Sequence, residues 1–208
     1  MWHSFKEKQK GFTIVELLVT LGIMVTITSV VLSNQSVYTD GAALSNLAEE
    51  MSITLSQAQS YGIAVKELTP GSSDFSSAYG ITASLLASGS SQAYLFFADR
   101  NSNQAYDGSW DCAVGGASEC LERVDFTHSN YIEEICVVRT NGVDQCNVAS
   151  RVDISFLRPN TEAQITFYNS SGNLYDPPNL KGVRIVLMSP AGRSNSVVVY
   201  SSGQISTE

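Results

Sequence analysis

Residues 12–32 read FTIVELLVTLGIMVTITSVVL, and this stretch decides the fold class of the chain. Glu16 is the only charged residue in it. A helix of this length, at about 1.5 Å per residue, spans roughly 30 Å, which is the thickness of the hydrocarbon core of a bilayer. The preceding residues 1–11, MWHSFKEKQKG, hold three lysines and one glutamate. Because basic residues favour the cytoplasmic side, we expect a single membrane-spanning helix with a cytoplasmic N-terminus.

Glu16 is the feature of this segment that needs a physical explanation. An ionised carboxylate inside a bilayer costs at least about 2.5 kcal/mol, and such residues usually have a specific partner or function. A secretory signal peptide is the alternative interpretation, with a weak cleavage site at Val31-Leu32-Ser33. However, the apolar stretch of a signal peptide is usually about 7–15 residues long. The sequence therefore favours a membrane segment in which Glu16 has a defined role.

Residues 11–19, GFTIVELLV, resemble the prepilin processing motif of type IV pilins and type II secretion pseudopilins. The resemblance implies that a membrane-bound prepilin peptidase cleaves after Gly11 and methylates the new N-terminal residue, Phe12. It also implies a role in assembly for Glu16, the glutamate at the fifth position of the mature chain. The motif covers about ten residues and lies at the expected end of the chain.

The resemblance also gives Glu16 a physical role. Cleavage would leave a positively charged amine on Phe12, and this amine also needs a partner in an apolar medium. If Glu16 pairs with the Phe12 amine of a neighbouring subunit, the pairing offsets both desolvation costs. It would also fix how far each helix slides past the next. The alternative is that Glu16 reaches the membrane surface or stays protonated, with no role in assembly.

The helix is expected to continue beyond the membrane segment. After residue 40, apolar residues recur every three or four positions, which places them on one face of a helix. No proline occurs before Pro70, so one helix over residues 12–62 is predicted, roughly 75 Å long. Its second half would dock on a head formed by residues 63–208, and residues 1–11 would be a leader that is removed. The apolar residues of this second half are Leu44, Leu47, Met51, Leu55, Ala58 and Tyr61.

The rest of the chain is typical of an antiparallel β head. After a serine- and glycine-rich stretch, short apolar and β-branched runs alternate with turn residues. Asn141-Gly142, between two such runs, is the strongest hairpin signal. The predicted fold class is α+β: a long N-terminal hydrophobic stalk helix packed on a mainly antiparallel head, the lollipop arrangement of pilins. The predicted strands are 62–67, 79–86, 93–98, 131–140, 143–149, 151–157, 163–168, 183–188 and 196–200.

Two passages of the head resemble the GspH/FimT-like group of minor pilins and pseudopilins. Residues 95–111, LFFADRNSNQAYDGSWD, are similar to the Asp/Asn-rich turn that follows a strand in that group. Residues 194–206, SNSVVVYSSGQIS, are similar to its final hairpin. The order of a long helix followed by strands, without a C-terminal helix, is also similar. The resemblance implies a minor rather than a major subunit.

Four cysteines lie in the predicted head: Cys112, Cys120, Cys136 and Cys146. An exported head meets an oxidising compartment, where an even number of cysteines favours disulfides, and three pairings are open. We favour Cys136–Cys146, because a three-residue loop centred on Asn141 would place them opposite each other, which leaves Cys112–Cys120. Zinc is a poor alternative, because no CxxC spacing occurs and the mature chain keeps one histidine.

One pattern in the head is typical of a metal site. It consists of Asp99, Asn101, Asn103 and Asp107. Oxygen ligands at alternate positions resemble the start of an EF-hand loop, so calcium is the cation that this pattern would bind. The pattern departs from the EF-hand at Gln104, where glycine is required, and at Trp110, where the bidentate glutamate belongs. Asx turns without an ion are the alternative.

Charge and motifs restrict the remaining function classes. The chain has 12 basic and 20 acidic residues and a net charge of -8, which gives no general attraction to nucleic acid. The six basic residues after residue 138 are interleaved with acids rather than clustered, so nucleic acid is not an expected partner. No GxSxG, HExxH or phosphate-binding glycine loop occurs, and no enzymatic activity or cofactor other than calcium is predicted.

These observations predict a small filament subunit. Its expected partners are other pilin or pseudopilin subunits, the prepilin peptidase, and the lipid of the bacterial cytoplasmic membrane before assembly. The expected final location is an extracellular or periplasmic filament. The alternative from another class is a membrane-anchored or secreted β-rich binding module, for DNA or a surface, in which residues 12–32 are only an anchor or a signal.

Overall fold

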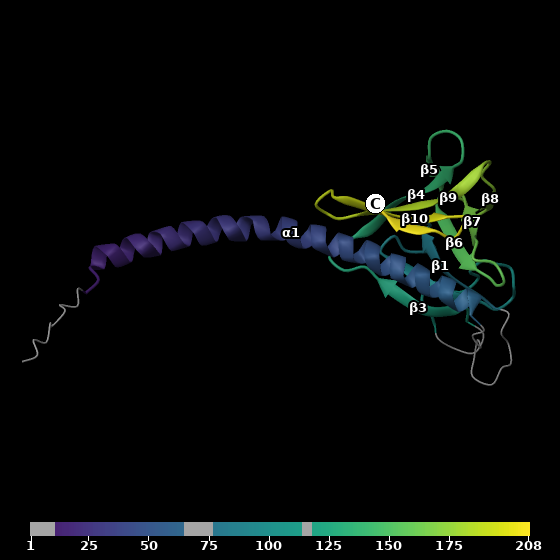
Figure 1. The fold of residues 1–208 in the computed structure, drawn as a ribbon, viewed down its shortest axis with the longest axis horizontal. Helices are drawn as coiled ribbons and strands as arrows, with labels where there is room; N and C mark the ends of the chain where they lie inside the picture. The colour runs from purple at the N-terminus through teal and green to yellow at the C-terminus, as the bar shows by residue number, and fades with distance from the viewer. Residues whose placement is uncertain (1–10, 65–76, 114–117) are drawn as a thin grey trace, which may run out of the picture. The chain divides into compact units, whose positions relative to one another are not determined.

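The computed structural model describes residues 11–64, 77–113 and 118–208, with the backbone alone for residues 33–37. Within these residues the chain forms one α-helix followed by eleven strands (Figure 1). The elements are α1 (Ile14–Ile63), β1 (Ala78–Ser84), β2 (Ala93–Asp99), β3 (Cys120–Asp125), β4 (Tyr131–Arg139), β5 (Gln145–Ala149), β6 (Arg151–Phe156), β7 (Ala163–Tyr168), β8 (Leu174–Tyr175), β9 (Leu180–Met188), β10 (Ser194–Tyr200) and β11 (Ile205–Thr207). The chain divides into two compact units, Met1–Thr39 and Asp40–Glu208, and α1 contributes to both.

The head contains two antiparallel sheets. Sheet A has the strand order β3-β2-β1-β6-β7-β8, and sheet B has the order β11-β10-β9-β4-β5. Within each sheet, every paired strand runs antiparallel to its neighbour, as in the β1–β2 pair, where Ile81 faces Phe96. The predicted α+β class, with a long N-terminal helix and a mainly antiparallel head, is therefore confirmed.

The second half of α1 forms the centre of the core. Its apolar stripe, which includes Leu44, Met51 and Leu55, is buried against apolar side chains from both sheets, and Figure 1 shows this part of the helix lying along the strands. Sheet A contributes residues such as Tyr79 and Phe96, and sheet B contributes residues such as Ile185. A helix stripe with this spacing needs such a surface because its own propensity does not suffice in water.

A smaller apolar cluster lies on the other face of sheet A. Leu95 and Phe97 of β2 point away from α1 and pack with Tyr106 and Cys120. Trp110 and Cys112 pack against the edge of this cluster. Because side chains alternate between the two faces of a strand, β2 is buried along its whole length only if something covers this second face. The segment that follows β2, residues 100–112, is that cover.

The end of α1 corrects one prediction. Residues 62–67 were expected to form a strand, but α1 includes Gly62 and ends at Ile63; residues 65–67 lie outside the described residues. Gly62 is buried, and a Cβ atom there would lie 2.2 Å from the carbonyl oxygen of Phe156. Glycine at this position therefore allows α1 to approach β6 closely, and it does not mark the end of the helix.

Other strand predictions differ from the structure mainly at their ends. The run 143–149 is a strand only from Gln145, so β4 and β5 are joined by the five residues 140–144 and not by three residues centred on Asn141. β3 and β8 were not predicted. β3 is an edge strand with the sequence CLERVD and mostly exposed or half-buried side chains, so it carries no clear alternation.

Candidate functional site

The predicted cleavage position lies just outside α1. Gly11, Phe12 and Thr13 are exposed and precede the first helical residue, Ile14. Phe12 is 79% exposed, and no atom lies within 4 Å of a Cβ atom built on Gly11. The Gly11–Phe12 peptide bond is therefore free of secondary structure and of packing from the described part of the chain.

Thr13 determines where the helix begins. Its hydroxyl oxygen accepts a hydrogen bond from the backbone N–H of Glu16 at 3.2 Å, and its carbonyl oxygen accepts one from the N–H of Leu17 at 3.1 Å. These two bonds make Thr13 the N-cap of α1. The sequence Thr-x-x-Glu before an apolar run is the signature of a capping box, and it would have identified Thr13 from the sequence.

Glu16 lies in the first turn of α1, where a negative charge is favourable because the helix dipole is positive there. Among the described residues, the Glu16 carboxylate has no hydrogen bond and no ion pair, and only its backbone N–H is bonded. A carboxylate in an apolar segment without a partner in its own chain is suited to a partner in another molecule.

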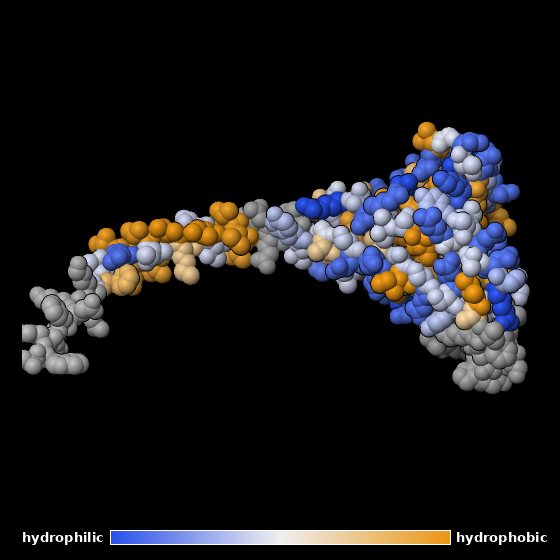
Figure 2. All heavy atoms as spheres, in the orientation of Figure 1, coloured by the Kyte–Doolittle hydropathy of each residue, from blue (hydrophilic) through white to orange (hydrophobic). Residues whose placement is uncertain are grey.

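The apolar segment that follows is exposed on all sides. Ile14–Leu32 is long and apolar enough to span a membrane, with a mean hydropathy of 2.3 and none of its residues buried. Figure 2 shows mostly hydrophobic residues along this part of α1, with a few hydrophilic and intermediate ones among them. Such a surface is stable only in lipid or against other proteins.

The predicted calcium ligands lie together in residues 99–107, but their oxygens bind backbone N–H groups. Asp99 is buried, and its Oδ1 accepts from the N–H groups of residues 101, 102 and 103, while its Oδ2 accepts from that of Gln104. The Oδ1 atoms of Asn101 and Asn103 accept from the N–H groups of residues 103 and 105. Both amides donate to Oδ2 of Asp107, at 2.8 and 2.6 Å. This is the geometry of successive Asx turns.

Two further buried carboxylates complete the bonding of this loop. Glu119 accepts from the N–H groups of Arg100 and Asp107, and Asp153 accepts from that of Tyr106. The N–H groups of residues 100–107 are therefore all bonded to side-chain oxygens. Asp153 is also paired with Arg151 at 2.6 Å. Because buried N–H groups need acceptors, these carboxylates let an irregular loop cover sheet A.

Sequence reasoning did not identify Glu119 and Asp153. Asp153 lies within the strand RVDISF and Glu119 lies next to Cys120, so neither forms a recognisable spacing with residues 99–107. The calcium interpretation stays a prediction. An ion bound by Asp99, Asn101 and Asn103 would share oxygens that already accept backbone N–H groups in the structure.

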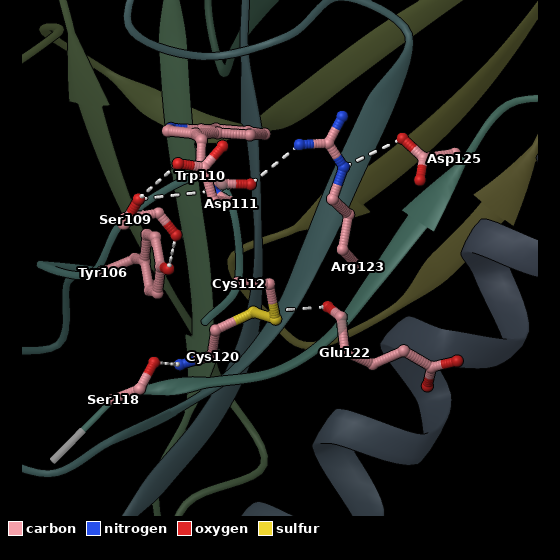
Figure 3. The surroundings of a disulfide bond; sticks show 10 residues. All are labelled: Tyr106, Ser109, Trp110, Asp111, Cys112, Ser118, Cys120, Glu122, Arg123 and Asp125. Atoms are coloured by element: carbon pink, nitrogen blue, oxygen red, sulfur yellow. Dashed lines mark hydrogen bonds and ion pairs between the residues drawn. A yellow bond between two sulfur atoms is a disulfide. The ribbon is translucent and has the colours of Figure 1, made fainter. Parts of the chain in front are cut away.

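The four cysteines form two disulfides, Cys112–Cys120 and Cys136–Cys146, which is the pairing that the sequence favours. Figure 3 shows the first of these, with the ring of Trp110 and the guanidinium of Arg123 nearby. Arg123 donates to the carbonyl oxygen of Trp110 at 2.9 Å and forms an ion pair with Asp125 at 2.9 Å. The disulfide and Arg123 thus fasten the end of the covering loop to β3.

Burial raises the pKa values of two tyrosines near this loop. The pKa of Tyr106 is raised to about 12, mainly by burial and also by the nearby carboxylate of Glu119, while Arg151 opposes the shift. Burial likewise raises the pKa of Tyr168, whose ring lies under the guanidinium of Arg151 at 4.5 Å, to about 12. Both side chains are therefore neutral packing groups at neutral pH. The described residues here are arranged for stability of the head.

Comparison with known proteins identifies the N-terminal segment. Residues 6–32 match the family model described as the prokaryotic N-terminal methylation motif. No match is found among curated proteins or among solved structures. The matched segment contains the exposed, non-helical Gly11–Phe12 bond, Glu16 and the exposed apolar residues of Ile14–Leu32. The chain therefore resembles a type IV pilin-like precursor, with a motif typical of structural rather than catalytic proteins and a helix suited to membrane anchoring.

Proposed function

We propose that the chain is a structural subunit, a minor pilin or pseudopilin, of a type IV pilus or a type II secretion pseudopilus. The observation that carries the proposal is the methylation motif at residues 6–32, together with the unburied apolar segment Ile14–Leu32 of α1. A plain anchor would need the apolar length alone. It would need neither a glycine three residues before the helix nor a carboxylate in the first turn of the helix.

The proposed processing uses the geometry around Gly11. A prepilin peptidase cleaves the Gly11–Phe12 bond, which is exposed and precedes the N-cap Thr13. The new amine of Phe12 is then methylated. Because Thr13 ends the helix on this side, the bond can enter a protease site in extended form without unwinding α1.

The proposed assembly step pairs charges between subunits. The processed amine of Phe12 is positive and lies at the positive end of the helix dipole, which is unfavourable. The Glu16 carboxylate has no partner among the described residues of its own chain. Contact between this amine and Glu16 of a neighbouring subunit satisfies both charges and sets the axial offset of the two helices. The exposed apolar residues of Ile14–Leu32 would pack in the same contact.

The proposed path begins in the bacterial cytoplasmic membrane. The subunit crosses it once, with the leader in the cytoplasm, and then moves into an extracellular or periplasmic filament. Three features support a GspH/FimT-type minor subunit. They are the long helix followed only by strands, the Asx-rich loop at 99–107, and the final hairpin β10–β11. No role for nucleic acid is proposed.

The first experiment is the intact mass of the chain purified from membranes that contain the cognate prepilin peptidase. We expect loss of residues 1–11, addition of one methyl group and absence of the four thiol hydrogens. Cleavage near Ser33 would overturn the proposal in favour of a secreted β-rich module. An uncut chain, with a known substrate processed in parallel, would leave a membrane-anchored binding module.

The second experiment separates processing from assembly. Glu16→Leu should be cleaved after Gly11 and retained in the membrane, but lost from sheared filaments. Glu16→Gln keeps the size and polarity of the side chain, so its loss from filaments would assign the effect to charge. Thr20→Ala is the matched control, because the Thr20 hydroxyl already donates to the carbonyl oxygen of Leu17 at 3.0 Å. Filaments that contain Glu16→Leu at the wild-type level would contradict the pairing.

A further inference from the structure

The loop between β4 and β5 contains the chain's one Asn-Gly pair, Asn141-Gly142. Residues 141–143 are exposed, and Val143, at 85%, is the most exposed large apolar side chain of the described head. No atom lies within 4 Å of a Cβ atom built on Gly142. The disulfide Cys136–Cys146 closes the hairpin behind this loop, so the loop can change without separating the strands.

We propose that Asn141 is a site of spontaneous covalent modification, at which the folded chain converts asparagine to aspartate and isoaspartate. The backbone nitrogen of Gly142 attacks the side-chain carbonyl carbon Cγ of Asn141. A bond forms between these atoms, the Cγ–Nδ2 bond breaks, and ammonia leaves with the proton of the attacking nitrogen. Water then opens the succinimide ring. Attack at Cγ gives aspartate, and attack at the backbone carbonyl carbon gives isoaspartate.

The structure provides what this reaction needs. The attacking nitrogen must be free, and among the described residues neither the Gly142 N–H nor the Asn141 side chain has a hydrogen bond. The residue after asparagine must not block the approach, and glycine has no side chain. Gly142 has φ +103°, outside the range that other residues adopt readily, so the backbone here depends on glycine.

Two other asparagines of the head, the exposed Asn103 and the half-buried Asn169, lack these features. Asn103 is followed by Gln104, its Oδ1 accepts from the N–H of Ala105 at 2.9 Å, and its amide donates to Asp107. Asn169 is followed by serine, and its Oδ1 accepts from the N–H groups of residues 171 and 173. Their side chains are held in Asx turns, so their Cγ atoms are not free to meet the next backbone nitrogen.

The consequence is a new negative charge at an exposed loop. The carboxylate would lie three residues before Asp144, which forms an ion pair with Arg184 at 3.2 Å. Arg184 also contacts Glu208 at 2.8 Å, so its charge is already shared between two carboxylates. The added charge would therefore remain on the surface beside Val143. A population of chains would then present two chemically different loops, one neutral and one acidic.

The test follows residue 141 in the intact, folded chain in detergent micelles, with disulfides formed. The chain is incubated in neutral and mildly alkaline buffer made with heavy-oxygen water and then mapped by proteolysis and mass spectrometry. We expect a mixture of aspartate and isoaspartate at 141, each with one heavy oxygen, and unchanged asparagine at 103. Asn141→Gln should lose the isoaspartate signal completely, because ring closure through the longer side chain is unfavourable.

Two outcomes would overturn the proposal. Asn141 could persist as long as Asn103 in the folded chain while converting in a reduced, denatured sample, which would mean that the loop prevents ring closure. Alternatively, conversion could give aspartate without isoaspartate, which would indicate direct hydrolysis of the amide. Gly142→Ala is a second variant, and far-ultraviolet circular dichroism shows whether the strained backbone of this variant still folds.

Discussion

The two halves of α1 contain similar residues with opposite burial. In the first half, Ile14–Leu32, the apolar side chains are exposed, and Leu18 is 62% exposed. In the second half, the apolar stripe that includes Met51 and Leu55 is fully buried, and Leu55 is 0% exposed. The second half presents one stripe to the head, whereas the first half is apolar all round. A helix that is apolar on every face is buried either in a protein core or in a membrane, and Ile14–Leu32 is not buried among the described residues.

Charged groups follow the same division. Asp99, Glu119 and Asp153 in the head are buried and bonded to backbone N–H groups of their own chain. The carboxylate of Glu16 in the first half has no such bond within the described residues. The buried carboxylates of the head are therefore bonded within it, whereas the Glu16 carboxylate has no partner among the residues that the structure describes.

The largest expected difference in the free energy of unfolding is between two leucine-to-alanine variants, one in each half of α1. Leu55→Ala leaves a cavity between α1 and the sheets, so the free energy of unfolding should fall by about 2–5 kcal/mol. Leu18→Ala removes atoms of an exposed side chain, and should change the free energy of unfolding by less than about 0.5 kcal/mol. Denaturant unfolding of the head in detergent, followed by near-ultraviolet circular dichroism, measures both. Equal losses would mean that the first half also packs on the head.

The two disulfides should contribute comparable stability to the head. Their sequence separations are 8 and 10 residues, and loop-closure entropy gives about 2.5 kcal/mol for each. Replacing Cys112 and Cys120 by serine should also release the loop that covers Leu95 and Phe97, which replacing Cys136 and Cys146 should not do. Hydrogen exchange at residues 100–107 distinguishes the pairs. Faster exchange in both variants would contradict a specific link between Cys112–Cys120 and this loop.

Removing the charge of Asp99, at the end of β2, should lower the free energy of unfolding by a somewhat smaller amount. Asp99→Asn replaces one acceptor oxygen by an NH₂ group that faces an N–H donor, so we expect a loss of about 2 kcal/mol. Asp111→Asn is the matched control, because Asp111 is exposed and should change the free energy by less than about 0.5 kcal/mol. Chemical denaturation at neutral pH provides the comparison. Equal effects of the two variants would contradict the role of burial.

The calcium interpretation predicts a different response of the same loop. If an ion binds, calcium should raise the melting temperature of the head, a chelator should reverse the rise, and Asp107→Asn should abolish it. If the Asx turns are complete without an ion, calcium should leave the melting temperature unchanged. Differential scanning calorimetry with magnesium as the control cation separates the two cases.

The elements predicted from the sequence are those with local signals. The spacing of Leu44, Met51 and Leu55 predicts the buried stripe of α1, and the apolar runs predict most central strands. β3 was missed because an edge strand with three charged residues has no alternation to read. The strand 62–67 was predicted wrongly because the contact that places Gly62 in α1, its close approach to Phe156, involves a strand distant in sequence.

The same distinction applies to the candidate site. Gly11, Phe12 and Glu16 form one short motif and could be named from the sequence alone. Asp99 was identified, but its bonding partners were not. An aspartate at this spacing is compatible with a calcium ligand and with an Asx turn. Only the backbone conformation shows that its oxygens accept backbone N–H groups. Glu119 and Asp153 join the loop through long-range packing, which leaves no spacing pattern.

The smallest expected change in stability comes from removing the contact between the second half of α1 and sheet A at Tyr94. The Tyr94 hydroxyl lies 2.9 Å from that of Thr54, and burial raises the pKa of Tyr94 from 10.0 to about 12. A raised pKa in the folded state means that its stabilising contribution is present below pH 10 and is lost as the pH rises toward 12. Tyr94→Phe should cost about 0.5–1.5 kcal/mol at neutral pH and make the fall in stability above pH 10 shallower. Thr54→Val removes a bond that lowers this pKa, so the tyrosinate absorbance of that variant should appear at higher pH. An alkaline unfolding curve unchanged in both variants would mean that Tyr94 does not report on the docking of α1.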